Sequence, residues 1–228
     1  MLNLLRLEYL MSLSTDYSTS TSQTDLTQLD LKDPHLESLN SNARAVLDFW
    51  FAKDNEPYWF AQNNDFDQRI NDKFGKIWQA AKQGECVCWR RAEERVNPVA
   101  NLAGRLAEII VLDQFSRNLC RGQAAAFTQD GMALVLAQEA IQQTHFDTLP
   151  MEWRRFIIMP FMHSESAAIH ERYLPLFEQL DDPETLDFEH RHKDIIDQFG
   201  RYPHRNEALN RESTAAEKEF LKQPNSSF

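Results

Sequence analysis

The fold is decided by residues 97–119, which read NPVANLAGRLAEIIVLDQFSRNL. Asn97 followed by Pro98 is a strong start signal, because an asparagine side chain can cap free backbone N–H groups and proline is tolerated at the first helical position. The apolar residues that follow cover more than one stripe of a helix. We therefore predict a long helix that runs to about Leu119 and lies at the centre of the molecule.

The rest of the chain predicts further helices and no strand. Only six of the 228 residues are glycine, which argues against a fold rich in tight hairpin turns. Helix ends are indicated by Gly84 and Gly200, and Pro160 is expected to end or kink one helix. Helix starts are indicated at Ser41 or Asn42, Asn64 or Asp65, Asp130, Pro150, Ser164, Asp182 with Pro183, and Thr214 with Glu217. We predict an all-α fold of about eight helices stacked in antiparallel pairs.

Charge and cysteine content exclude several classes of protein. The formal net charge of −11 lacks the basic footprint of proteins that bind nucleic acids or anionic membranes. Three cysteines without a C-x-x-C pair indicate neither a disulfide framework nor a cysteine-ligated zinc site, and they favour a reducing, cytoplasmic environment. No apolar run approaches the roughly 18 residues that a membrane-spanning helix needs. Self-association into a homo-oligomer stays open at this point.

The chain divides into a polar extension and one domain. Ten of the sixteen residues from 12 to 27 are serine or threonine, and we predict a flexible extension over residues 1–40. Residues 41–223 should form a single helical domain, and residues 224–228 a short tail. The apolar opening is interrupted by Arg6 and Glu8 and precedes no small-residue cleavage site, so we expect no export signal.

The first of three polar strings ends the predicted central helix. Asp113 and Arg117 are one turn apart and can form an ion pair, while Arg117 and Arg121 can complement the helix dipole. Asn118 belongs to the same string. In the alternative interpretation, Asp113 holds Arg117 in a fixed pose in which its guanidinium binds an anion or carboxylate.

The second string is Met159–Glu165, at a predicted junction between two helices. His163 is expected there either as a buried, hydrogen-bonded residue or as a pocket residue with acid–base or binding duties. His163 and Glu165 could ligate a metal together, but two ligands without a third at a fixed spacing form a weak pattern. We predict neither a metal nor a cofactor.

The third string begins at His192, on the apolar face of a predicted helix, where a histidine is more often a core residue than a ligand. The loop after that helix can present four polar side chains around a rigid proline at low entropic cost, namely Arg201, His204, Arg205 and Asn206. Alternatively, Arg201 caps the carbonyl groups of one helix and Asn206 caps the next helix.

Together with an earlier motif, these strings resemble the bacterial domain-of-unknown-function 924 family. The likeness is carried by Val46–Phe51, by Asp113–Asn118 followed by Arg121-Gly122, by Met159–Glu165, and by His192-x-x-Ile195-Ile196 leading into Phe199–Asn206. It covers roughly residues 43–223. The resemblance implies an all-helical fold with a tetratricopeptide-like arrangement of helix pairs, and it implies no activity.

Three functional hypotheses follow. The chain is a module that binds a protein or peptide in a groove, or it binds a small anionic metabolite in one pocket, or its polar strings are packing networks between helix ends. Whether the chain is an enzyme stays open. The candidate pocket residues are Asp113, Arg117, Asn118, Arg121, His163, Glu165, His192, Arg201, His204, Arg205 and Asn206.

Overall fold

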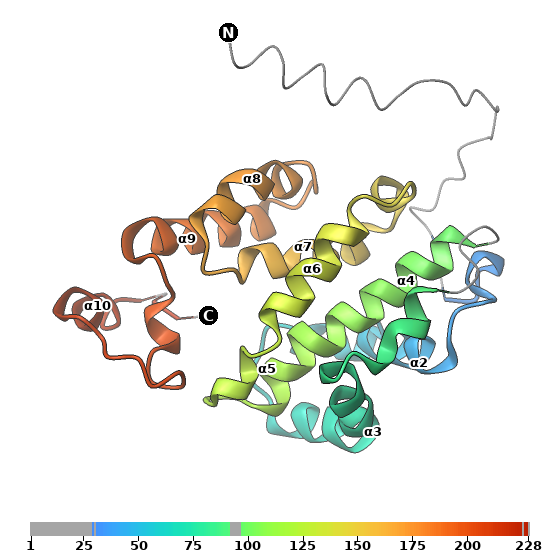
Figure 1. Cartoon of the computed structure of the whole chain (residues 1–228), viewed down its shortest axis with the longest axis horizontal. Helices are drawn as coiled ribbons and strands as arrows, with labels where there is room; N and C mark the ends of the chain where they lie inside the picture. Colours follow the sequence, from blue (N-terminus) through green and yellow to red (C-terminus); the bar gives the residue numbers. More distant parts are fainter. Residues whose placement is uncertain (1–28, 30, 92–96, 225, 228) are drawn as a thin grey trace, which may run out of the picture.

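The computed structural model describes residues 29, 31–91, 97–224 and 226–227, and every regular element in this part of the chain is a helix. The predicted all-α fold is confirmed (Figure 1). The longer helices are α2 (Ser41–Trp50), α3 (Asn64–Lys82), α4 (Pro98–Ile109), α6 (Asp130–Ala140), α7 (Met151–Met162), α8 (Ala167–Glu178), α9 (Pro183–Phe199) and α10 (Ala215–Phe220). Short 3-10 turns are η1 (Pro34–Leu36), η2 (Lys53–Tyr58), η3 (Glu85–Arg90), η5 (Ala124–Ala126), η6 (Phe146–Thr148) and η7 (Pro203–Arg205).

The predicted central helix is confirmed. α4 continues without a break into a π-helical segment, η4 (Ile110–Phe115), and then into α5 (Ser116–Leu119). The Asn97 side chain caps its start by accepting a hydrogen bond from the Ala100 N–H at 3.3 Å. Every residue from 99 to 120 is buried except Arg105, Arg117 and Leu119. Burial around the whole circumference explains why the apolar residues of this stretch do not form a single stripe.

The other helices pack around this centre. α4 contacts α2, α6 and α7, while α3 contacts η4 and α5. Later helices pack on their neighbours in sequence, α6 on α7, α7 on α8 and α8 on α9. Figure 1 shows α8, α9 and α10 grouped at one side of the body formed by α2 to α7. A small second core around Ile195, Ile196 and Tyr202 joins this group to the loop after α9.

One glycine allows a close approach between two elements. A Cβ atom at Gly104 of α4 would lie 1.8 Å from the carbonyl oxygen of Trp89 in η3. Because the contact is with backbone, no side-chain rotation can relieve it. The pairing of α4 with η3 therefore requires glycine at position 104.

Several predicted caps are confirmed. Asp182 accepts a hydrogen bond from the Thr185 N–H, and Thr214 and Glu217 form a reciprocal capping box at α10. Gly84 and Gly200, beyond the ends of α3 and α9, have φ angles of 76° and 69°, which glycine adopts without strain.

Other boundaries differ from the prediction. Asn40, not Ser41 or Asn42, caps α2, and Ser166, not Ser164, precedes α8. α7 continues through Pro160 for two more residues, so this proline does not end the helix at once, and a kink there stays a prediction. Asp130 opens α6 without capping it, since its carboxylate is used elsewhere.

The packed body begins before the predicted boundary at residue 41. Leu36 and Leu39 are buried against the main core, and η1 contacts α4. Residues 1–28 and 30 of the extension predicted over residues 1–40 lie outside the described residues. Among the described helices, none combines the length and the apolar character that crossing a membrane requires.

Candidate functional site

The site begins at the π-helical segment of the central helix. Asp113 and Gln114 are consecutive and both are buried, because this segment is covered on all sides. The Gln114 amide donates to Oδ2 of Asp113 at 2.6 Å. π-helical turns inside α-helices often occur at functional sites, which makes Asp113 a starting point.

Asp113 holds two residues of the predicted strings. Nη1 of Arg117 lies 3.0 Å from Oδ1 of Asp113, so the predicted ion pair is confirmed. Nδ1 of His163, at the end of α7, lies 2.8 Å from the same oxygen. A carboxylate can only accept hydrogen bonds, so Nδ1 of His163 carries the proton and Nε2 keeps its lone pair.

Charges in this cluster fix its protonation. Burial alone would raise the pKa of Asp113, but Arg117 and His163 outweigh it and hold that pKa far below its ordinary value. Burial and the positive charge of Arg117 lower the pKa of His163, and Asp113 opposes them only in part. At neutral pH the cluster therefore contains an ionised Asp113, a charged Arg117 and a neutral His163.

Asp130 links this cluster to the loop after α9. Its carboxylate accepts two hydrogen bonds from Arg117, both at 3.1 Å, and one from Nη1 of Arg205 at 3.0 Å. The prediction that Asp130 caps α6 is wrong, because two guanidinium groups from other elements occupy its oxygens. Asp130 is a functional candidate that the sequence analysis missed, since an acid in a first helical turn has the same sequence signal as a cap.

Arg205 is held between two aromatic rings. Its guanidinium carbon lies 4.6 Å from the ring centre of Phe127 and 4.5 Å from that of Tyr202. The residue is 5% exposed, and Nε has no hydrogen-bond partner in the described part of the protein. Burial lowers the pKa of Arg205, and the positive charge of Arg117 lowers it further. The pKa of Arg117 is raised instead, because the charges of Asp113 and Asp130 outweigh the effect of its burial. Arg205 is therefore the less well compensated of the two cations.

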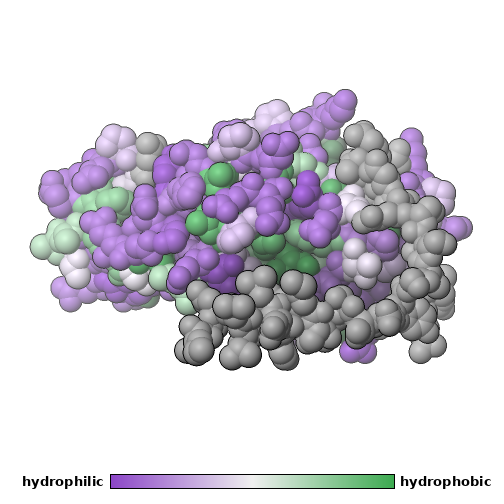
Figure 2. Space-filling view, turned by 90° about the horizontal axis from the view of Figure 1, so that it is seen from above, coloured by the Kyte–Doolittle hydropathy of each residue, from purple (hydrophilic) through white to green (hydrophobic). Residues whose placement is uncertain are grey.

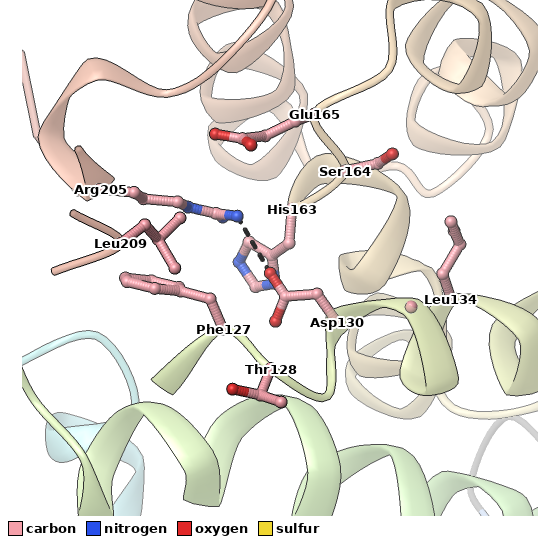
Figure 3. Close-up of a pocket in the computed structure, with 10 residues that line it drawn as sticks. Phe127, Thr128, Asp130, Leu134, His163, Ser164, Glu165, Arg205 and Leu209 are labelled. Carbon is pink, nitrogen blue, oxygen red and sulfur yellow. Dashed lines mark hydrogen bonds and ion pairs between the residues drawn. The ribbon is translucent and has the colours of Figure 1, made fainter. Parts of the chain in front are cut away.

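A pocket of about 310 Å³ opens beside these groups (Figure 3). The end of Arg205 points into it toward Asp130, with Glu165 and His163 close by in the same view. Its lining residues are Phe127, Thr128, Asp130, Gly131, Leu134, His163, Ser164, Glu165, Arg205 and Leu209. The pocket thus combines one acid–base side chain, two acids and one arginine with an apolar wall.

Glu165 is in the pocket wall and is already paired. Its oxygens accept from Nη1 and Nη2 of Arg211 at 2.6 and 2.9 Å, and one of them also accepts from the Tyr202 N–H at 2.7 Å. Burial would raise the pKa of Glu165, but these hydrogen bonds outweigh it and lower that pKa. Arg211 is a further residue of this site that no local sequence pattern places near Glu165.

A buried network supports the pocket from behind. The Tyr202 hydroxyl donates to the Met162 carbonyl oxygen at 2.6 Å, which attaches the loop after α9 to the end of α7. His170 bridges Oε1 of Glu189, at 2.7 Å, and the Ser164 carbonyl oxygen, at 2.9 Å. Through these contacts α8 and α9 fix the loop that carries His163 and Glu165.

His192 and His204 lie next to the site. The His192 ring centre is 6.4 Å from that of His163, and Nδ1 of His192 donates to the Phe188 carbonyl oxygen at 2.7 Å. Burial lowers the pKa of His192 well below its ordinary value. His204 packs against Tyr202, and burial followed by the charge of Arg205 lowers its pKa to about 4. Both side chains are therefore neutral neighbours of the pocket.

Two of the predicted residues lie elsewhere, at the end of α5. The Asn118 amide donates to the carboxylate of Asp67 in α3 at 2.7 Å. Arg121 donates to the same carboxylate through Nε at 2.6 Å and through Nη2 at 3.0 Å. These contacts join two helices, and neither residue lines the pocket. The membership of Asn118 and Arg121 in the predicted pocket is not supported by this placement.

Two residues of the loop after α9 also have structural partners. Arg201 makes a two-pronged ion pair with Glu217 of α10, at 2.6 and 2.8 Å. Asn206 contacts Ser213 and Arg211 within the following loop. Arg201 therefore does not cap α9 carbonyls as the alternative interpretation expected, and neither residue reaches the pocket. Within the described residues, no group of three or more His, Cys, Asp or Glu side chains is placed to hold a metal ion.

Comparison with known proteins identifies the family. Residues 46–225 match the family described as bacterial protein of unknown function (DUF924). A solved structure of the protein of unknown function ATU0120 from Agrobacterium tumefaciens is 33% identical, with a TM-score of 0.71 over 79% of this chain and 96% of that chain. No curated protein matches. Because the family match extends over most of the chain, the protein belongs to the bacterial DUF924 family.

Proposed function

We propose that the pocket binds a small organic anion of metabolite size, with Arg205 as its anchor. The observation that carries this proposal is the small number of hydrogen bonds that the Arg205 guanidinium makes within the described residues. A guanidinium has five N–H donors, and Arg205 makes one hydrogen bond with the described residues, to Asp130. Its charge is desolvated between two rings, where an ionic hydrogen bond is stronger than in water.

The distribution of charge supports an anion at this position. Three acids and three arginines either line the pocket or pair with a lining residue, namely Asp113, Asp130, Glu165, Arg117, Arg205 and Arg211. Arg117 has two carboxylate partners, and Arg211 forms the ion pair with Glu165. Arg205 shares its single partner, Asp130, with Arg117. An added negative charge would therefore be stabilised most at Arg205.

The size and the walls of the pocket fit a small molecule with an apolar part. A volume of about 310 Å³ lies at the lower end of the range for small-molecule sites. Phe127, Leu134 and Leu209 form the apolar part of the lining. They can contact the hydrocarbon portion of an organic acid while Arg205 binds its charged end.

Calorimetric titration with short carboxylic acids tests this proposal in Arg205→Met. Asp130 keeps Arg117 as a partner in this variant, so no buried carboxylate loses all its counter-charge. Arg191→Met is the matched control, because Arg191 pairs with the exposed Asp187 on α9, outside the pocket. Acids that bind the wild type should bind Arg191→Met equally and Arg205→Met at least about tenfold more weakly. Equal affinity in all three proteins would refute the role of Arg205.

A tetratricopeptide-like module that binds a protein partner is a second proposal. Its support is the sequential packing of α6 to α9 and the exposure of Met132 and Val135 on α6. The face seen in Figure 2 is mostly hydrophilic, with hydrophobic side chains in smaller patches between. If the partner is a second copy of the chain, sedimentation velocity should show a dimer that Val135→Asp dissociates. A monomeric wild type would rule out this form of the proposal.

The cytoplasmic location expected from the cysteine content stays a prediction.

A further inference from the structure

The carboxylates in the pocket already have charged partners. Asp130 accepts hydrogen bonds from Arg117 through both oxygens and from Arg205 through Oδ2. Glu165 accepts from both terminal nitrogens of Arg211. Guanidinium groups thus neutralise both acids, and neither carboxylate has an unbalanced negative charge to offer a ligand.

The hydroxyl groups of the lining are also poorly placed to bind a ligand. Thr128 donates its hydroxyl to the Ala124 carbonyl oxygen at 3.0 Å, one helical turn earlier. Figure 3 shows the Ser164 hydroxyl pointing away from Arg205 and His163. The hydroxyl and carboxylate oxygens still have acceptor lone pairs. The lining also contains a nitrogen acceptor that accepts no hydrogen bond from a described residue.

His163 supplies that acceptor. Nδ1 donates to Asp113, and no described residue forms a hydrogen bond with Nε2. Nε2 is not fully buried, since the His163 side chain is 13% exposed and lines the pocket. The pocket therefore contains a neutral nitrogen lone pair that the protein leaves available.

Geometry keeps this lone pair in place. Asp113 is oriented by the Gln114 amide at 2.6 Å and by Arg117 at 3.0 Å, and it fixes the His163 ring through Nδ1. Because the His163 ring is already fixed by its hydrogen bond to Asp113, it loses little conformational entropy when a ligand binds to Nε2. Asp113 is a positioning residue here, because it acts on a ligand only through His163.

The charge of the acceptor selects the kind of donor. A ligand ammonium next to neutral His163 would bring a positive charge that the paired Asp130 and Glu165 do not balance. A hydroxyl brings a donor without a charge, so a neutral acceptor can satisfy it fully. The pocket therefore favours a hydroxyl over an ammonium.

We propose that the ligand is a hydroxy acid, whose anionic group binds Arg205 while its hydroxyl donates to Nε2 of His163. This inference rests on the proposed anion site at Arg205 and adds the chemical class of the ligand. The apolar wall of Phe127, Leu134 and Leu209 contacts the carbon chain between or beside the two polar groups.

Calorimetry with matched pairs of acids tests the inference on the full chain. The probes are 3-hydroxybutyrate against butyrate, and phenyllactate against phenylpropionate. The hydroxy member of a pair should bind the wild type about tenfold more tightly than its partner. In His163→Leu, which lacks the acceptor, the ratio should fall to about one. His190→Leu is the matched control, because His190 is exposed on α9, and it should keep the wild-type ratio.

The outcomes separate the two proposals. Arg205-dependent binding with equal affinity for both members of each pair would overturn the hydroxy-acid inference and leave the anion site standing. Loss of all binding in Arg205→Met, together with a preserved hydroxyl preference in His163→Leu, would place the hydroxyl contact elsewhere and also overturn it. If no acid of either kind binds the wild type, both proposals fail.

Nitrogen-15 NMR of the ligand-free protein gives a second test that needs no ligand and does not depend on Arg205. Two-bond correlations of the His163 ring should show a protonated Nδ1 and an unprotonated Nε2 near neutral pH. In Asp113→Asn the fixed tautomer should be lost, with Nε2 protonated in part of the molecules. A wild-type Nε2 that carries the proton would exclude it as an acceptor and overturn the inference.

Discussion

Gly104→Ala should destabilise the protein strongly, although alanine is the better helix former. The new Cβ would lie 1.8 Å from the Trp89 carbonyl oxygen, and ordinary contact begins at 3.4 Å. η3 and α4 would therefore have to move apart by about 1.6 Å at a point where both are packed into the main core.

The expected magnitude follows from two opposing effects. Overpacking of a core with a backbone shift costs about 3 kcal/mol or more, while replacing a helical glycine by alanine contributes about 1 kcal/mol of stability. The net loss should be about 2 to 3 kcal/mol. Urea unfolding followed by far-UV circular dichroism measures it as a lower midpoint with an unchanged slope.

Gly75→Ala in α3 is the matched control for the same chemical change. There the nearest atom to the new Cβ is Oδ1 of Asn71 at 3.1 Å, on an exposed side chain that can turn away. This variant should be neutral or more stable by up to about 1 kcal/mol. If Gly104→Ala unfolds at the same urea concentration as Gly75→Ala, the close approach of α4 and η3 is not as described.

Three further predictions concern polar groups. Thr214→Ala should lower the free energy of unfolding by about 1 kcal/mol, because it removes half of the capping box with Glu217, and urea unfolding would detect no change if the box is unimportant. Asp113→Asn should cost about 3 kcal/mol near neutral pH through the loss of a buried charge pair. The pKa of Asp113 is held below its unfolded value of 3.8, so its contribution is present above that pH and is lost in acid; a variant with the wild-type acid profile would contradict this. Burial raises the pKa of Glu189 above 4.5, so this carboxyl lowers stability as the pH rises through the raised value, by up to about 1.4 kcal/mol per pH unit. Glu189→Gln should remove that slope from a pH series of unfolding curves, and an unchanged slope would show that Glu189 is not its source.

The proposed anion site is compatible with an acidic chain because charge is arranged unevenly. The net charge of −11 belongs to the sequence as a whole, whereas acids and arginines near the pocket are equal in number. Local potential depends on which carboxylates lie within a few ångströms of a cation and on their burial. Arg205 combines strong burial with a shared partner, and that combination distinguishes it from the other arginines.

Local sequence predicted most of the helical framework. Asn97, Asp182 and Thr214 cap helices as expected, because a cap depends on backbone groups two or three residues away. The central position of residues 97–119 was predictable too, since apolar residues on all sides of a helix require partners on all sides. The pair of Asp113 and Arg117 follows from the one-turn spacing of the same helix.

The site required contacts between residues far apart in the chain. His163 lies 50 residues from Asp113, and Arg205 lies 75 residues from Asp130. Arg201 and Arg205 belong to one short string with similar sequence signals, yet one binds Glu217 of α10 and the other enters the pocket. The sequence by itself determined the all-helical framework, the caps at Asn97, Asp182 and Thr214, and the central element, because these depend on interactions within one or two turns. Only the tertiary structure decided which cation and which histidine meet at the pocket, because that choice depends on how α5, α6, α7 and the loop after α9 pack against one another.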